Sequence, residues 1–133
     1  MDLDKTFGTD ANLEETGVWI ELDKTSSIKI ARMGNKRSKE MATRLNKSAK
    51  IANKYSLSDV GEDDLTDIIA HTVIIDWKGI KLKGQELPFS VENAKKVLKE
   101  YKDFRGLILE LSTEMETFRK IEIEEGKENL KKS

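Results

Sequence analysis

The chain has 133 residues and a net charge of −1, and 37% of its residues are charged, well above the usual share of about 25%. A chain of this length can bury roughly two-thirds of its unfolded surface as one domain, so one hydrophobic core is possible. Cysteine is absent, which excludes disulfides and thiolate chemistry and favours an intracellular protein. The N-terminus lacks the layout of a signal peptide, and the longest apolar stretch, Val73-Ile74-Ile75, is too short to cross a bilayer. A soluble protein is therefore predicted.

The first predicted elements in chain order are a polar arm and a β-hairpin. Residues 1–15 show no sustained period and predict a flexible arm. Apolar residues then alternate in residues 18–22 and again in residues 28–33, with a polar turn between them, which is typical of a hairpin. A lone hairpin is marginal in water, so it must pack on helices or on another copy.

Two helices are predicted after the hairpin. Residues 37–55 carry a thin apolar stripe of small residues, so this helix should be the most exposed one, with lysines on its outer face. Residues 62–77 begin with three acids, which favour the positive end of a helix dipole, and continue with apolar residues at helical spacing as far as Trp77. A strand at Val73-Ile74-Ile75 is the alternative.

A connector with a short extended pair around Ile80 and Leu82 should occupy residues 78–87. Pro88 sets the approach to the next helix, and Ser90 is a good N-cap for it. The apolar face of that helix comprises Ala94, Val97, Leu98 and Tyr101. Asp103 can cap a last helix, whose stripe runs from Phe104 through Phe118 to Ile121. The predicted fold is mainly α with a small N-terminal β-hairpin (α+β). About four helices lie in one domain over residues 16–121, between the arm and a charged, fraying tail at 122–133.

Charge is unevenly distributed along the chain. Residues 1–23 carry seven acids and one base (net −6), residues 24–54 ten bases and one acid (net +9), and residues 55–77 six acids without Lys or Arg (net −6). Either these blocks attract one another, within one fold or between identical subunits, or the basic block binds nucleic acid. The neighbouring acids favour the first interpretation, because nucleic-acid-binding modules usually lack compensating acids so close by.

The residue types that carry catalysis or bind metals form no recognisable group. His71 is the only histidine, so a triad or a histidine-based metal site lacks partners, and a packed or half-exposed helix residue is predicted. The acids at 59–67 do not fit the calcium-loop pattern. The glycines are scattered and form no phosphate-binding loop. We therefore predict no catalytic residue, no metal, no cofactor and no enzyme.

The aromatic residues on either side of the connector allow two interpretations. Trp77 and Phe89 either pack, on each other or on the core, or form an anchor where a partner docks. The candidate partner-binding residues are these two with Tyr101, Arg37, Arg44 and Lys47. Structural roles are predicted for Gly79, Pro88, Ser90, Asn93 and Ala94.

A known family shows a similar order of residues. Asp76-Trp77-Lys78-Gly79-Ile80, a glycine-containing turn, and Leu87-Pro88-Phe89-Ser90-Val91-Glu92-Asn93-Ala94 resemble the tail assembly chaperones of long-tailed bacteriophages and prophages. The segments 18–21 and 28–35 also resemble the opening of that family, so the likeness spans roughly residues 16–118. Lys83-Gly84-Gln85 departs from the pattern, since the family has an acid before this glycine.

The resemblance implies a non-enzymatic protein made in the host bacterial cytoplasm and absent from the mature virion. Members of that family coat the tape measure protein, keep it soluble, help recruit tail tube subunits and self-associate. The oppositely charged blocks fit a homo-oligomer that pairs head to tail. Neither a membrane nor nucleic acid is an expected partner. The alternatives are a small nucleic-acid-binding regulatory protein that uses residues 24–54, and a structural head–tail connector or minor tail protein.

Overall fold

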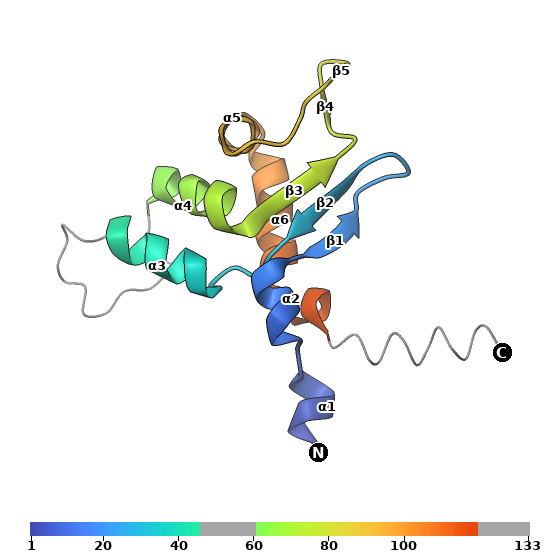
Figure 1. The fold of residues 1–133 in the computed structure, drawn as a ribbon, viewed down its shortest axis with the longest axis vertical. Coiled ribbons are helices and arrows are strands. Elements are labelled where there is room, and N and C mark those ends of the chain that lie inside the picture. Colours follow the sequence, from blue (N-terminus) through green and yellow to red (C-terminus); the bar gives the residue numbers. More distant parts are fainter. Residues whose placement is uncertain (46–60, 120–133) are drawn as a thin grey trace.

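The computed structural model describes residues 1–45 and 61–119, which form an α+β fold of helices packed on a small antiparallel sheet (Figure 1). This confirms the predicted fold class, although the described part has six α-helices where about four were predicted. The elements are α1 (Leu3–Phe7), α2 (Ala11–Thr16), β1 (Val18–Glu21), β2 (Ser27–Ile30), α3 (Lys36–Leu45), α4 (Glu62–Ile68), the π-helical turn η4 (Ile69–Val73), β3 (Ile74–Lys78), β4 (Lys81–Leu82), β5 (Gln85–Glu86), α5 (Val91–Glu100), α6 (Lys102–Thr113) and the 3₁₀ turn η5 (Met115–Phe118).

The main sheet has the strand order β1-β2-β3, with both pairs antiparallel. The predicted hairpin is confirmed as β1 and β2. Its turn is held by one carboxylate oxygen of Asp23, which accepts hydrogen bonds from the backbone N–H groups of Thr25 (2.9 Å) and Ser26 (2.8 Å). Such local bonds explain why a polar segment closes a hairpin here.

The third strand corrects a prediction. The helix predicted for residues 62–77 ends at Val73, where the π-helical turn runs directly into β3, so Trp77 lies on a strand. The alternative strand at Val73–Ile75 was closer to the structure. A β-bulge explains the misleading spacing: Lys29 pairs with Asp76 and Ile30 with Ile74, which leaves Ile75 as the extra residue. Ile74 and Trp77 therefore both face the core although they are three residues apart.

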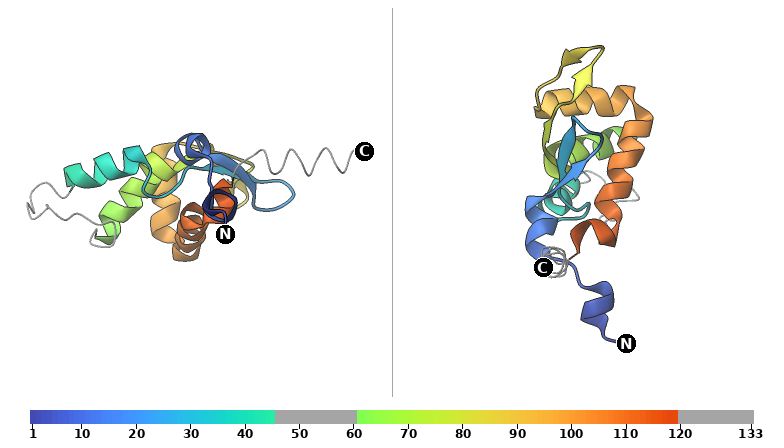
Figure 2. Two further views of the ribbon diagram at one scale, coloured as in Figure 1. Left: turned by 90° about the horizontal axis from the view of Figure 1, so that it is seen from below. Right: turned by 90° about the vertical axis from the view of Figure 1, so that its right-hand side faces the viewer.

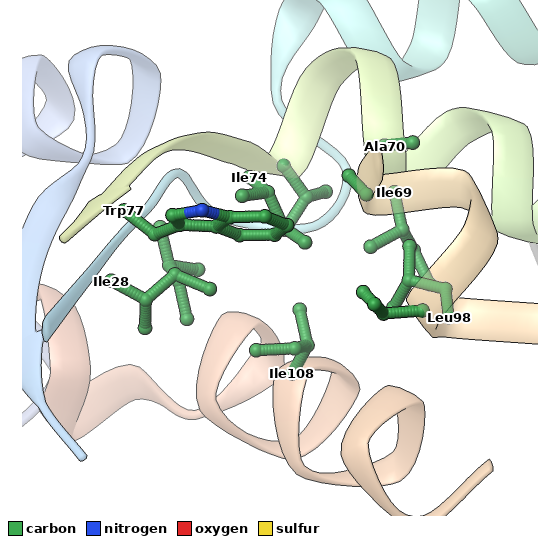
Figure 3. Close-up of a cluster of buried hydrophobic side chains, with 11 residues drawn as sticks. Ile28, Ile69, Ala70, Ile74, Trp77, Leu98 and Ile108 are labelled. Carbon is green, nitrogen blue, oxygen red and sulfur yellow. The ribbon is translucent and has the colours of Figure 1, made fainter. Parts of the chain in front are cut away.

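The core lies between the sheet and the two helices that cover it. Ile28, Ile74 and Trp77 project from the sheet toward Leu98 of α5 and Ile108 of α6, and all five side chains are at most 5% exposed (Figure 3). Figure 2 shows the sheet and α6 as two layers, with α5 crossing one end. The opposite face of the sheet carries Trp19, whose exposed ring lies 4.3 Å from the Lys78 ammonium, measured to the ring centroid.

Two helices differ from their predicted extents. Helix α3 is described to Leu45, and the rest of the helix predicted to Tyr55 lies outside the described residues. Helix α6 starts directly after Tyr101 without a side-chain cap, so the cap predicted at Asp103 was wrong. It ends before Glu114, where the backbone becomes extended, and the apolar stripe continues only as the turn η5. Ile121 and the predicted tail lie outside the described residues.

The N-terminal residues contain two short helices for which the sequence predicts none. Asp2 and Asp10 cap α1 and α2 with carboxylate oxygens that accept hydrogen bonds from backbone N–H groups. Helix α2 is held to the body by the Arg32–Glu14 ion pair and by a backbone hydrogen bond from Arg32 N–H to the Glu14 carbonyl (2.9 Å). Helix α1 projects beyond it along the long axis of the molecule (Figure 1). The domain limits at residues 15, 16, 121 and 122 stay predictions.

Candidate partner-binding surfaces

Trp77 and Phe89 meet across the connector. Their rings form an edge-to-face pair with centroids 5.2 Å apart and an interplanar angle of 84°. The indole Nε1–H of Trp77 donates a hydrogen bond to the carbonyl of Leu87 (2.8 Å), and the Trp77 side chain is only 5% exposed. We call Trp77, Gly79, Leu87 and Phe89 the junction. The structure agrees with the first interpretation, because the two rings pack on each other and Trp77 is buried in the core. A role of either ring in partner binding stays a prediction.

The glycine of the junction is required by its backbone. Gly79 has φ of +70°, a conformation that L side chains rarely adopt, and a Cβ atom at this position would overlap the carbonyl oxygen of Thr25. The β1–β2 turn therefore lies directly against the end of β3. No other residue fits here without moving one of the two backbones.

The start of α5 is built by the residues predicted for it. The hydroxyl of Ser90 accepts a hydrogen bond from the backbone N–H of Asn93 (3.0 Å), and the Asn93 side-chain amide donates to the Pro88 carbonyl (2.9 Å). Ala94, one turn further, is completely buried in the core. Pro88 and Asn93 thus hold the connector against the helix start, and Ala94 allows the helix to approach the sheet.

Strands β4 and β5 form a small hairpin at one end of the molecule. Lys81 pairs with Glu86 and Leu82 with Gln85, and the two-residue turn Lys83-Gly84 has positive φ at both positions (52° and 83°). This is the backbone of a type I′ turn, for which Asn-Gly and Asp-Gly are preferred. Lys83 is the residue at which the sequence departs from the family that it resembles.

A groove lies between this hairpin and the α5–α6 corner. It has a volume of about 410 Å³, within the range of about 300–1,000 Å³ typical of ligand sites. Its apolar lining is Ile80, Leu82, Val97, Tyr101 and Phe104, and Lys81 and Lys83 flank it. Tyr101 is 42% exposed, so its side chain is not buried with the other residues of the apolar face predicted for α5. We call this set of residues the groove.

The candidate cations lie elsewhere. Arg37 and Arg44 are exposed on α3, and Lys47 lies outside the described residues. The Arg37 guanidinium donates a hydrogen bond to the backbone carbonyl of Glu15. The five described candidates for partner binding therefore separate: Trp77 and Phe89 lie in the junction, Tyr101 in the groove, and Arg37 and Arg44 on α3.

Acids of both acidic blocks form ion pairs with bases elsewhere in the chain. Glu14 of the first acidic block pairs with Arg32 of the basic block. Two acids of the later block pair with cations further along the chain, Asp67 with Lys95 (2.8 Å) and Glu62 with Arg105 (2.7 Å). The hydrogen bond and charge of Arg105, together with Lys102, lower the pKa of the exposed Glu62 carboxyl. The Glu14–Arg32 pair agrees with the interpretation in which the blocks attract one another within one fold, whereas Lys95 and Arg105 lie outside the basic block.

The side chains with potential for metal or acid–base chemistry are dispersed. His71 is exposed on the π-helical turn, so of the two predicted positions, packed or half-exposed, the packed one was wrong. Over residues 1–45 and 61–119, no three His, Cys, Asp or Glu side chains gather closely enough to hold a metal ion. In the same part of the chain, every helix is too short or too polar to span a bilayer.

Most of the groove was missed from the sequence. The sequence predicts only Tyr101 as a candidate for partner binding. It predicts an ordinary extended pair at Ile80 and Leu82, and it assigns Phe104 to the apolar stripe of a helix. The available signal was the alternation of apolar residues and lysines in Ile80-Lys81-Leu82-Lys83, which puts apolar side chains on one side of a short exposed hairpin.

The fold and these surfaces define a small α+β protein with a packed aromatic junction beside an open apolar groove. Residues 25–129 match a family model described as YdaY prophage protein. The match covers most of the chain, including the junction and the groove, so the chain belongs to this family and is a prophage protein. No curated protein and no solved structure matches the chain.

Proposed function

We propose that this protein is a tail assembly chaperone, which binds the tape measure protein, keeps it soluble and helps recruit tail tube subunits. It acts without catalysis in the host bacterial cytoplasm and does not enter the mature virion. Membership of a prophage family supports a role in a phage life cycle. The finer assignment depends on the resemblance of residues 76–98 to the chaperones of phage tails.

One observation carries the proposal: the residues that bear the resemblance act together as one structural unit. Trp77 bonds Leu87 and packs on Phe89, Ser90 caps α5, and Asn93 bonds Pro88. These contacts give a structural reason for residues 77–93 to keep these residue types in this order. The unit also keeps the β4–β5 hairpin beside α5, so that an apolar surface stays open to solvent.

The test is co-expression with the tape measure protein encoded by the same prophage, followed by measurement of the soluble fraction of that client. We expect the client to be largely insoluble alone and soluble with the chaperone. Gly79→Ala, which disrupts the junction, should abolish the effect, whereas Gly61→Ala, at a glycine with open space around it, should keep it. A client that is equally soluble without this protein contradicts the proposal.

Two surface variants locate the client contact. Tyr101→Glu changes the groove, and the double variant Arg37→Glu/Arg44→Glu changes the exposed face of α3. Loss of client solubility in one variant and not in the other assigns the contact to that surface.

A second candidate function is nucleic-acid binding, for which the exposed cations of α3 are the specific observation. Lys36, Arg37, Lys39 and Arg44 are all exposed on this short helix. Binding to random-sequence DNA that weakens steeply with salt, with a slope of several phosphates, would favour this function over the chaperone. Arg37→Glu/Arg44→Glu should then reduce the slope.

A further inference from the structure

The groove is held on both sides by the fold. It lies at the end of the molecule opposite α1 (Figure 1), and in the side view of Figure 2 the β4–β5 hairpin stands above α5. On the hairpin side, the carbonyl of Ile80 accepts a hydrogen bond from the Leu87 N–H (2.8 Å). On the helix side, Val97 is only 6% exposed and belongs to the core. A partner therefore meets an ordered surface and loses little entropy in ordering it.

The rim of the groove is apolar and open to solvent. Tyr101 is an exposed tyrosine, and Leu82 and Phe104 beside it are half-buried. Within the described part of the chain, the Tyr101 hydroxyl has no hydrogen-bond partner. An exposed tyrosine next to apolar side chains is typical of a binding hot spot, because its ring supplies apolar contact and its hydroxyl supplies a hydrogen bond.

The charged groups that line the groove are all positive. Lys81 and Lys83 contribute to the lining, and no acid does. Over residues 1–45 and 61–119 neither lysine forms an ion pair, although Glu86 lies opposite Lys81 in the hairpin. On the helix corner, the two lysines and two acids of residues 99–103 cancel. The hairpin lysines are therefore the charges left to attract an acidic partner.

The shape of this surface favours a helical partner over an extended one. Strands β4 and β5 have only two residues each, so their edges offer little backbone for pairing with a further strand. The apolar surface instead continues along α6, where Leu107 is 40% exposed and lies one turn beyond Phe104. An amphipathic helix fits such a surface with apolar side chains that are one turn apart.

We propose that the groove binds a helical segment of the client, with two large apolar side chains one turn apart and acidic residues beside them. The apolar side chains pack against Leu82, Tyr101 and Phe104, and the acids lie near Lys81 and Lys83. This inference rests on the proposed function, because its partner is the client named there.

The test is photo-crosslinking in cells that co-express the full chain with the tape measure protein of the same prophage. The photoreactive aromatic residue p-benzoylphenylalanine replaces Tyr101 in one variant and Trp19 in the other. Trp19 is a matched control, because it is 40% exposed and lies on the far face of the sheet. Position 101 should crosslink to the client and position 19 should not. Mass spectrometry of the crosslinked peptide should identify an apolar segment that contains acidic residues.

The crosslinked segment, made as a synthetic peptide, then tests the two parts of the contact. Tyr101→Glu should weaken its binding by roughly 30-fold, the loss expected for a hot-spot residue. Lys81→Glu/Lys83→Glu should weaken it by roughly 10-fold at low salt, and a peptide whose acids are replaced by lysines should restore the binding of this variant. Lys24→Glu/Lys96→Glu makes the same change of charge at two exposed lysines outside the groove and should bind like wild type.

The outcomes separate this inference from the proposed function. Equal crosslinking from positions 19 and 101, a crosslinked segment without acids, or wild-type binding by both groove variants would each overturn the inference. A client that the wild-type protein nevertheless keeps soluble would leave the proposed function standing. A client that stays insoluble with the wild-type protein would overturn both.

Discussion

The junction and the N-terminal segment use the same residue types in opposite ways. At the junction, Phe89 packs on Trp77, and hydrogen bonds that Trp77 and Asn93 donate to Leu87, Pro88 and Ser90 hold the residues on either side of it. In α1, Phe7 belongs to an equally well-capped turn, yet its ring is mostly exposed. Local capping therefore fixes the backbone in both places. Only long-range contacts decide whether an aromatic side chain stabilises the fold or remains free for another molecule.

The largest expected effect comes from the glycine of the junction. Gly79→Ala should lower the free energy of unfolding by about 3 kcal/mol or more, because the added methyl group meets the Thr25 carbonyl and the positive φ is strained. Gly84→Ala is the matched control: it has a similar φ but open space around it, so it should cost only about 1 kcal/mol. Urea unfolding measures both. Equal losses would show that the contact with the β1–β2 turn is unimportant.

Substitution of Phe89 and of Phe7 compares the junction with α1 directly. Phe89→Ala should destabilise the monomer by about 2 kcal/mol, less than for a fully buried ring because Phe89 is half-buried. Phe7→Ala should change the stability of the monomer by less than about 0.5 kcal/mol. Thermal melts at low concentration, where copies are separate, test this pair. A large loss with Phe7→Ala would mean that α1 packs on its own chain.

A smaller effect concerns Asp23, whose carboxylate accepts hydrogen bonds in the β1–β2 turn. Hydrogen bonds from Ser26 and Thr25 lower the pKa of Asp23 below its ordinary value of 3.8. A carboxyl with a lowered pKa in the folded state stabilises the fold above its unfolded pKa, and this contribution is lost as the pH falls through the folded pKa. Asp23→Asn should therefore flatten the decline in urea midpoint below about pH 4. A decline in Asp23→Asn as steep as that of the wild type would contradict this prediction.

The smallest effect is a gain in stability beside the junction. Lys83 occupies a positive-φ position of the β4–β5 turn, and asparagine adopts this conformation at a lower energetic cost than lysine. Lys83→Asn should raise the free energy of unfolding by about 0.5 kcal/mol. Lys81→Asn, on the neighbouring strand at negative φ, is the control and should give no gain. If both variants are neutral, the turn contributes nothing to the stability of the junction.

The elements that could be predicted are those with local signals. The alternation in residues 18–33 predicted the hairpin, and Pro88 with Ser90 predicted the start of α5, since turn and cap residues act on their immediate neighbours. Helices α1 and α2 span five and six residues, too short for a helical period to appear, and only their capping aspartates hinted at them.

The elements that were missed depend on contacts between distant parts of the chain. Strand β3 exists because β2 offers it a partner, and its bulge places Ile74 and Trp77 at a spacing that resembles a helix. The groove combines a hairpin at residues 80–83 with a helix corner at 97–104. The sequence pattern of neither segment indicates that it packs beside the other. Among the candidate site residues, those with structural roles were identified well, and the exposed apolar surfaces were not.

The bulge at Ile75 has a consequence for how this strand tolerates changes in length. Two isoleucines stand side by side at 74 and 75, and removal of one leaves a plain alternating strand in which Ile, Asp and Trp keep their inward, outward and inward directions. A single-codon deletion at this point therefore preserves the interior. Deletion of Asp76 gives the same alternation, with Ile75 in place of the aspartate on the outward side, so Trp77 keeps its inward direction. Family members that differ in length in this strand should accordingly have their one-residue gap between Ile74 and Trp77.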